Sequence, residues 1–215
     1  MPSRIAAALL TIVVVFALPD PSRAQWVDSY GVKVGVVSAS AADNLDTFDR
    51  RTGLTASLFA ERHLLPYLSL TAEVGYVQRG FVETQVERTA TGEVVGVVKA
   101  NTRLDYLTIP VMAKLGYHLT PALLYAMAGP RLDVLLGREP GVFEFSSITI
   151  ESIIADAYGS PAVGMTIGVG VSTTGLFPAG LLLEGRYEFD FTDSFAAGPR
   201  ETRNNAFTVM VGVVF

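Results

Sequence analysis

The 215-residue sequence contains no cysteine and only two histidines, His63 and His118. Without cysteine the chain has neither a disulfide framework nor the acylation site of a bacterial lipoprotein. Two distant histidines do not form a zinc-type ligand cluster. The sequence also carries no phosphate-binding or other cofactor motif. The glycine-rich segment GVGVS is interpreted as part of an alternating strand. We therefore predict no metal site and no cofactor.

Charged residues are also scarce. They make up 17% of the chain, below the roughly 25% of ordinary soluble domains, whereas hydrophobic residues make up 50%. Beyond the N-terminus there is nevertheless no uninterrupted run of about 18 apolar residues, which a transmembrane helix requires. The apolar residues must therefore be distributed over many short segments.

The N-terminus has the features of an export signal. Arg4 precedes the apolar run IAAALLTIVVVFAL, and Ser22 and Ala24 have the small-x-small spacing of a signal-peptidase site. We expect residues 1–24 to be a cleaved signal peptide and residues 25–215 to form the mature domain. A retained anchor helix is the alternative, although the run is short for a span.

The expected mature chain is acidic. The full sequence has 16 basic and 21 acidic residues, and removal of Arg4, Arg23 and Asp20 leaves 14 and 20, a net charge of −6. This balance argues against a nucleic-acid partner, because such proteins neutralise phosphates with basic surfaces.

After Trp26, apolar residues alternate with polar or small residues, with a period of two. In LLLEGRYEFDF the large apolar residues alternate with Glu184, Arg186, Glu188 and Asp190, so one face is apolar and the other charged. Such alternation predicts eight strands, at about 31–39, 52–60, 68–76, 105–119, 126–134, 163–172, 181–191 and 206–215. Short and long connections alternate between them, which is typical of an outer-membrane barrel.

A soluble sandwich or lipocalin-type barrel would place the apolar faces inside, whereas a transmembrane barrel places them against lipid. The polar faces contain many glycines, including Gly75, Gly116 and Gly168, which suit a narrow lumen better than a soluble surface. The sequence therefore predicts an all-β protein, an eight-stranded antiparallel transmembrane β-barrel of the bacterial outer membrane.

The charges on the polar faces are balanced. With Asp190 set aside near a strand end, four are basic and four acidic: Lys33, Glu73, Lys114, Arg131, Asp133, Glu184, Arg186 and Glu188. Because an unpaired buried charge costs several kcal/mol, we expect these residues to form a lumenal ionic network. Eight strands enclose only enough space for side chains, so the favoured interpretation is a structural plug; a gated pore or lumenal ligand site is the alternative.

The segment NAFTVMVGVVF is predicted to be the closing strand, because every strand edge within hydrocarbon must be paired. Phe207, Val209, Val211, Val213 and Phe215 would face lipid, with Phe215 at the periplasmic interface. A C-terminal aromatic residue on such a strand also resembles the signal that the barrel assembly machinery of bacteria recognises.

The segment RLDYLTIPVMAKLGY and the glycine-rich strand that ends at Phe215 resemble the PorT-type outer-membrane β-barrel group of Bacteroidetes and related bacteria. The resemblance extends over essentially everything after the signal. It implies an outer-membrane barrel, and members of the group range from secretion-associated proteins to barrels without an assigned role.

Three local features add further expectations. The hairpin from about Leu68 to Tyr117 has arms near 20 residues, twice what a membrane crossing needs, so its 82–105 region should project from the cell surface and offer an edge to a protein partner. Pro110 predicts a local bulge.

The loop SSITIESIIADAYGS predicts a short helix, with Ser147 as its cap.

The predicted function is that of a monomeric outer-membrane barrel with a plugged polar lumen and a structural or surface-interaction role, in contact with outer-membrane lipid. A narrow pore or a carrier of small hydrophobic ligands is the alternative. An enzyme acting on lipid is a more distant one, because both histidines fall at predicted periplasmic turns. We predict no enzymatic activity.

Overall fold

The computed structural model describes residues 27–42, 48–88, 91–145, 149–151, 161–173, 179–192 and 203–215. The predicted signal peptide at 1–24 lies outside these ranges. In the described residues, no helix is long and apolar enough to cross a membrane.

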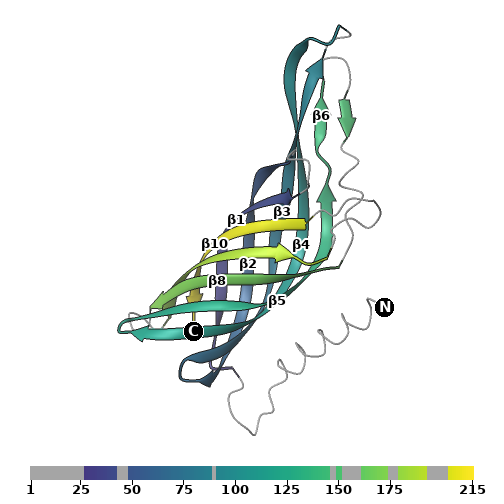
Figure 1. The fold of residues 1–215 in the computed structure, drawn as a ribbon. Helices are drawn as coiled ribbons and strands as arrows, with labels where there is room; N and C mark the ends of the chain where they lie inside the picture. Colours follow the sequence, from purple (N-terminus) through teal and green to yellow (C-terminus); the bar gives the residue numbers. More distant parts are fainter. Residues whose placement is uncertain are drawn as a thin grey trace.

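Eight strands form a closed antiparallel barrel, as the alternating sequence predicts (Figure 1). Their order around the barrel is β1-β10-β9-β8-β5-β4-β3-β2. Each barrel strand therefore pairs with the barrel strands before and after it in the chain, and the first pairs with the last. The strands are β1 (Ser29–Ala42), β2 (Phe48–Leu65), β3 (Leu68–Arg88), β4 (Val94–Leu119), β5 (Ala122–Glu139), β8 (Ala162–Thr173), β9 (Gly180–Asp190) and β10 (Arg203–Val214).

The barrel closes where β1 meets β10. The pairing continues from Gly31 opposite Val214 to Ala42 opposite Arg203. Beyond it, Tyr30 and Phe215 exchange two backbone hydrogen bonds of 3.1 and 2.7 Å, and their rings stack with centroids 5.8 Å apart. The segment 206–215 is therefore the closing strand.

Side chains alternate between two environments along every barrel strand. On β1, Val32, Val34 and Val36 are exposed on the outer surface, whereas Lys33 is buried in the lumen. The same outward apolar rows occur on all eight strands, and they form the belt that faces lipid in an outer-membrane barrel. Four aromatic side chains mark the end of this belt at the short turns: Tyr30, Tyr67, Tyr117 and Phe215.

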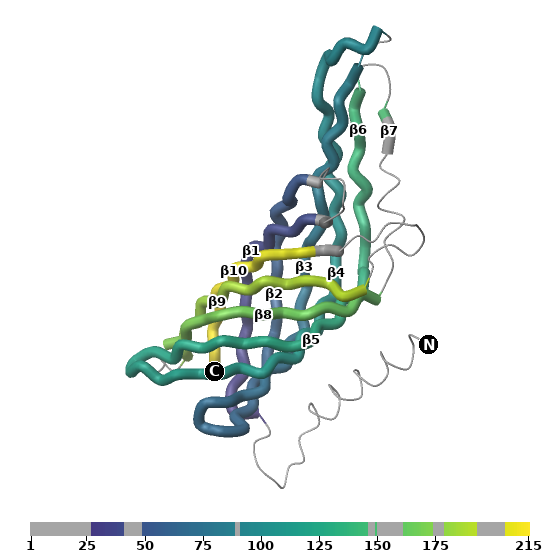
Figure 2. Tube along the Cα trace, in the orientation of Figure 1, coloured from purple at the N-terminus to yellow at the C-terminus, as the bar shows by residue number. Residues whose placement is uncertain are grey.

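The two ends of the barrel differ. At one end β2–β3 and β4–β5 are joined by two-residue turns, at 66–67 and 120–121; short turns are typical of the periplasmic side. At the other end β3 and β4 continue beyond the ring as a projecting hairpin, and β6 (Val142–Glu144) and β7 (Thr149–Glu151) form a separate two-stranded sheet beside it (Figures 1 and 2). Gly92 near the hairpin tip has a φ of 86°, which favours glycine.

Three local expectations are corrected. The pairing of β4 with both neighbours keeps a constant register on either side of Pro110, so that residue makes no bulge; the shift lies between Asp105 and Tyr106. A proline removes only one ladder donor, and the paired residues on either side preserve the register.

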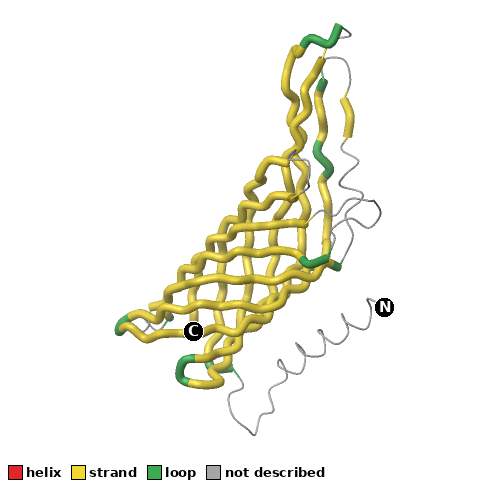
Figure 3. The backbone as a smooth tube through the Cα atoms, viewed as in Figure 1, coloured by secondary structure: helices red, strands yellow, loops and turns green. Residues whose placement is uncertain are grey.

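The second and third corrections concern loops. Thr149–Glu151, expected in a short helix, forms β7 and pairs with β6, because a neighbouring extended segment satisfies its backbone groups (Figure 3). Ser147 and residues 152–160 lie outside the described residues. Residues 61–65, which lie in the connection expected between the predicted strands 52–60 and 68–76, continue β2 as far as Leu65, because they pair with β3.

Candidate functional site

The lumen is filled largely by charged side chains. Among the described residues, five basic and seven acidic side chains are buried. They include all eight residues predicted to form the lumenal ionic network, together with Glu61, Arg79, Glu83 and Asp190. These residues come from β1, β2, β3, β4, β5 and β9. Each occupies an inward position of its strand because side chains alternate between the two faces of a strand.

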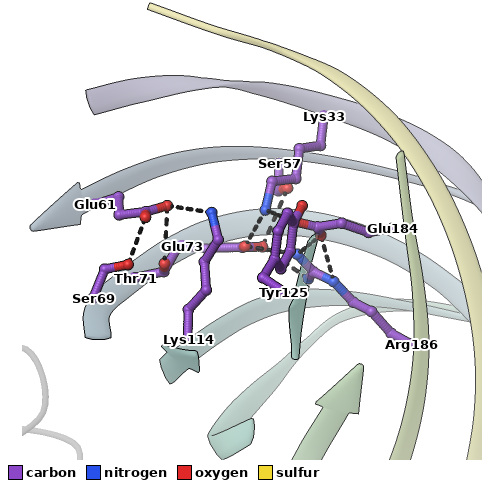
Figure 4. A network of polar contacts seen from close by, with 10 residues as sticks. All are labelled: Lys33, Ser57, Glu61, Ser69, Thr71, Glu73, Lys114, Tyr125, Glu184 and Arg186. Atoms are coloured by element: carbon purple, nitrogen blue, oxygen red, sulfur yellow. Dashed lines mark hydrogen bonds and ion pairs between the residues drawn. The ribbon is translucent and has the colours of Figure 1, made fainter. Parts of the chain in front are cut away.

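One group of contacts, here called the inner cluster, consists of Lys33, Glu73, Glu184, Arg186 and Tyr125 (Figure 4). The Lys33 ammonium donates to Glu73 at 2.6 Å and to Glu184 at 2.8 Å. The Arg186 guanidinium donates to both oxygens of Glu73, at 2.7 and 2.9 Å, and also pairs with Glu184. The Tyr125 hydroxyl donates to Glu184 at 2.8 Å. Two cations thus neutralise two carboxylates, and these four charged residues come from three strands, β1, β3 and β9.

The inner cluster continues toward the periplasmic end through Glu61, which was not selected from the sequence. Lys114 donates to Glu61 at 2.8 Å, and the hydroxyls of Ser69 and Thr71 also donate to it (Figure 4). The Lys114 ammonium lies 4.0 Å from the centroid of the Tyr125 ring, which adds a cation–π contact.

A second group, here called the outer cluster, lies beyond the inner one toward the hairpin. Arg79 donates to Asp133 at 2.5 Å and to Glu188 at 2.6 Å. Arg131 donates to Asp133 at 2.8 Å and pairs with Asp190. Three carboxylates and two guanidiniums therefore occupy this level, and all five side chains are almost completely buried.

Apolar side chains fill the lumen above the outer cluster. This apolar cap consists of Val37, Ala39, Val77, Phe81, Leu104, Tyr106 and Ala206, with the partly buried Leu135 packed against it. Phe81 and Leu104 are at most 1% exposed. Ions crossing the barrel would have to pass two paired ionic layers and this apolar layer.

A cavity of about 170 Å³ opens below the inner cluster. Its lining includes Glu61, Lys114, His63 and His118, so it lies at the periplasmic mouth. The His63 Nδ1 atom is 3.9 Å from Glu61, and its side chain is 56% exposed. In the described residues, neither imidazole has a Ser or Thr hydroxyl in hydrogen-bond contact, and no group of three His, Cys, Asp or Glu residues is arranged to hold a metal ion.

Polar side chains on the outer surface mark where the lipid-facing belt ends. Arg103 makes a bidentate pair with Asp105, with both distances 2.9 Å, and donates to the Tyr76 hydroxyl at 3.2 Å. The hydrogen bonds that the Arg103 guanidinium donates to Asp105 and to Tyr76 raise the pKa of this partly exposed group above its ordinary value. The strands therefore leave the membrane at this level.

The residues missed by sequence reasoning had a detectable signal. Arg79 occupies an inward position because the alternation of β3 continues through Val77, Arg79, Phe81 and Glu83, beyond the predicted end at Tyr76. Glu61 was placed in a turn that proves to be strand. Asp190 was set aside as terminal, yet it is the partner of Arg131.

These features define a closed outer-membrane β-barrel with a charged lumen. Residues 23–196 match the family described as "Outer membrane protein beta-barrel domain", which is most of the chain. The protein therefore belongs to this family and is located in the bacterial outer membrane. No curated protein matches the chain.

Solved structures of several small outer-membrane proteins are similar. The attachment invasion locus protein Ail of Yersinia pestis has a TM-score of 0.46 and 9% identity, covering 87% of this chain and 98% of its own. Neisserial surface protein A has a TM-score of 0.46 and 15% identity, covering 86% and 97%. AlkL, solved in lipid bilayers, has a TM-score of 0.46 and 15% identity, covering 92% and 94%.

Proposed function

We propose that this protein is a non-conducting outer-membrane barrel whose function is to hold the projecting hairpin above the cell surface for contact with a protein partner. The observation that carries the proposal is the filling of the lumen. Two paired ionic clusters and the apolar cap succeed one another along the axis, which favours a plug over a pore. A structural plug makes the barrel a rigid base for what projects from it.

Features of the hairpin support the interaction role. Thr84–Arg88 of β3 pairs with β4 on one side, whereas among the described residues the pairing of β3 with β2 ends at Glu83 opposite Phe48. Val86 and Val97 lie directly opposite each other and are 47% and 59% exposed. Isolated two-stranded hairpins are marginally stable in water, so an apolar pair on one face favours a partner that covers it.

The lumen proposal is tested by conductance. The purified full-length protein, reconstituted in planar bilayers, is expected to show no stepwise currents. A variant with Arg131→Ala and Arg186→Ala removes one guanidinium from each cluster and is expected to leak ions, provided that it keeps the heat-modifiable mobility of a folded barrel. Discrete channel openings in the wild type would overturn the plug.

The surface role is tested separately, on intact cells. Protease shaving should cleave within the 82–105 region, and affinity purification should recover a partner with the wild type. Val86→Lys with Val97→Lys should abolish that recovery, because it places two charges on the exposed apolar pair. Gln85→Lys, on the opposite face, is the matched control. Equal recovery by both variants would contradict the proposal.

Two finer assignments belong to the same proposal. The strand RLDYLTIPVMAKLGY supports a place in the PorT-type group and with it a secretion-associated partner. The exposed position of His63 and His118 at the periplasmic mouth, away from the surface hairpin, supports a protein without catalytic activity. Loss of a lipid modification in a His63→Ala, His118→Ala strain would contradict the latter.

A further inference from the structure

A shallow, widely open groove lies on the outside of the barrel. It is an apolar groove of about 750 Å³ on the periplasmic half of the outer surface, over β4, β5, β8 and β9. Its floor and walls include Leu115, Leu124, Ala126 and Val169, and the two tyrosines Tyr67 and Tyr117 also line it. The groove is part of the belt that faces the membrane, so hydrocarbon and not water covers it.

The sequence of β5 explains the depression. Ala126 points outward and is paired with Leu115 of β4 on one side and Val169 of β8 on the other. The next outward residue toward the periplasm, Leu124, is paired with Tyr117 and Val171. The methyl group of Ala126 therefore lies between the larger side chains of Leu115 and Val169. The outer surface of a barrel is convex, but at this point it becomes concave.

Two hydroxyl groups lie at the periplasmic end of the groove. Tyr67 belongs to the turn between β2 and β3, and Tyr117 lies two residues before the end of β4. Their side chains are 58% and 69% exposed. Neither hydroxyl makes a hydrogen bond to any described residue. Tyrosines at a membrane interface place the ring among acyl chains and the hydroxyl among head groups.

We propose that this groove is a binding site for one phospholipid of the periplasmic leaflet. One acyl chain lies along Ala126 between Leu115 and Val169, and the Tyr67 and Tyr117 hydroxyls donate to the ester or phosphate oxygens of the same molecule. The groove is continuous with the established lipid-facing surface, which identifies lipid as its occupant. A chain held in a concave surface contacts protein on more sides than one lying against a convex surface, and it should exchange more slowly with bulk lipid.

The test uses the full chain in vesicles of phosphatidylethanolamine and phosphatidylglycerol. After mild detergent extraction, native mass spectrometry should show one phospholipid retained on the wild-type barrel. Ala126→Phe fills the groove and is expected to reduce the retained fraction by about tenfold, the equivalent of about 1.4 kcal/mol. The matched control is Ala56→Phe, at an exposed alanine of β2 that is paired with Val34 and Tyr76 and lies away from the groove.

A second variant separates the head group from the chain. Tyr117→Phe keeps the ring and removes the hydroxyl, so a smaller, several-fold loss of retained phospholipid is expected. Equal retention by Ala126→Phe and Ala56→Phe, or a wild-type barrel that retains no phospholipid, would overturn the proposal. A lipid-free dimer that Ala126→Phe dissociates would overturn it as well, since it would identify a second copy as the occupant. None of these results depends on whether the lumen conducts or the hairpin binds a partner.

Discussion

Single residues in the lumen stabilise the barrel through buried ion pairs. The sequence indicated that inward charges must be paired. The structure shows two cations for two carboxylates in the inner cluster and two guanidiniums for three carboxylates in the outer cluster. In each cluster a guanidinium contacts two carboxylates: Arg79 pairs with Asp133 and Glu188 of two other strands, and Arg186 pairs with Glu73 of β3 and with Glu184 of its own strand. The free energy of unfolding should therefore be far more sensitive to the removal of one member than the modest net value of a surface ion pair suggests.

Arg186→Ala tests this sensitivity. It leaves Glu73 and Glu184 buried with only Lys33 as a cation, and should lower the free energy of unfolding by about 3–5 kcal/mol, as expected when one partner of a buried pair is lost. The measurement is urea unfolding in lipid vesicles. Lys99→Ala is the control, because Lys99 forms an exposed pair with Asp49 at 3.3 Å and should contribute under about 1 kcal/mol. Similar losses in both variants would contradict the clusters' role.

A glycine pair offers a second test at this scale. A Cβ atom at Gly170 would lie 2.5 Å from the Tyr125 ring, whereas nothing lies within 4 Å of one at Gly185. Gly170→Ala should therefore lower the unfolding free energy by about 1–3 kcal/mol through overpacking, and displace the Tyr125 hydroxyl from Glu184. Gly185→Ala should leave stability unchanged or slightly raised. Thermal unfolding followed by heat-modifiable gel mobility compares the two, and the reverse order would refute the packing argument.

At the scale of elements, the projecting hairpin and the barrel are expected to be independent. Thr84 and Lys99 lie opposite each other, so residues 85–98 can be replaced by an Asn-Gly turn that joins the two strands. The shortened protein should assemble with an unchanged unfolding midpoint, because the apolar cap and both ionic clusters lie outside the deletion. It should also lose the surface protease site. A large drop in the midpoint would show that the hairpin is part of the folding unit.

The strands also show which parts of the fold could be predicted from the sequence. The eight strands, their order of pairing and the inward charges follow from a period of two, because a strand with one lipid face must alternate. The strand ends did not follow: β2 and β3 extend past their predicted ends at Ala60 and Tyr76. Backbone pairing with neighbouring strands, which is non-local, sets where a strand stops. That is why Glu61 and Arg79 were missed, and why the 149–151 segment was expected to be a helix.

The sequence also could not predict that the buried charges form two separate clusters. Lys33 and Arg186 are separated by most of the chain, and their common contacts with Glu73 and Glu184 depend on the stagger of strands around the barrel. The apolar cap was missed for the same reason. Val37, Phe81 and Leu104 occupy inward positions that a simple scheme of polar lumen and apolar exterior would assign to charged or small side chains.

For the whole molecule, closure between β1 and β10 is the step on which every other feature depends. The seam brings Lys33 to Glu184, and it removes the last free edges from the hydrocarbon. Because the natural chain has no cysteine, a single engineered pair reports on this seam without interference. Val34 lies directly opposite Val211 on the outer face, whereas Val213 lies opposite Val32.

Val34→Cys with Val211→Cys should form a disulfide on oxidation of the folded protein, because directly opposite residues in an antiparallel pair have Cα atoms about 4.5–5.5 Å apart, within the range that disulfides span. Val34→Cys with Val213→Cys should not, since diagonal neighbours lie about 7–8 Å apart. A mobility shift that only reducing agent reverses identifies the bond. Efficient bonding in the second pair and not the first would mean a barrel with a different register, in which the inner cluster cannot form as described.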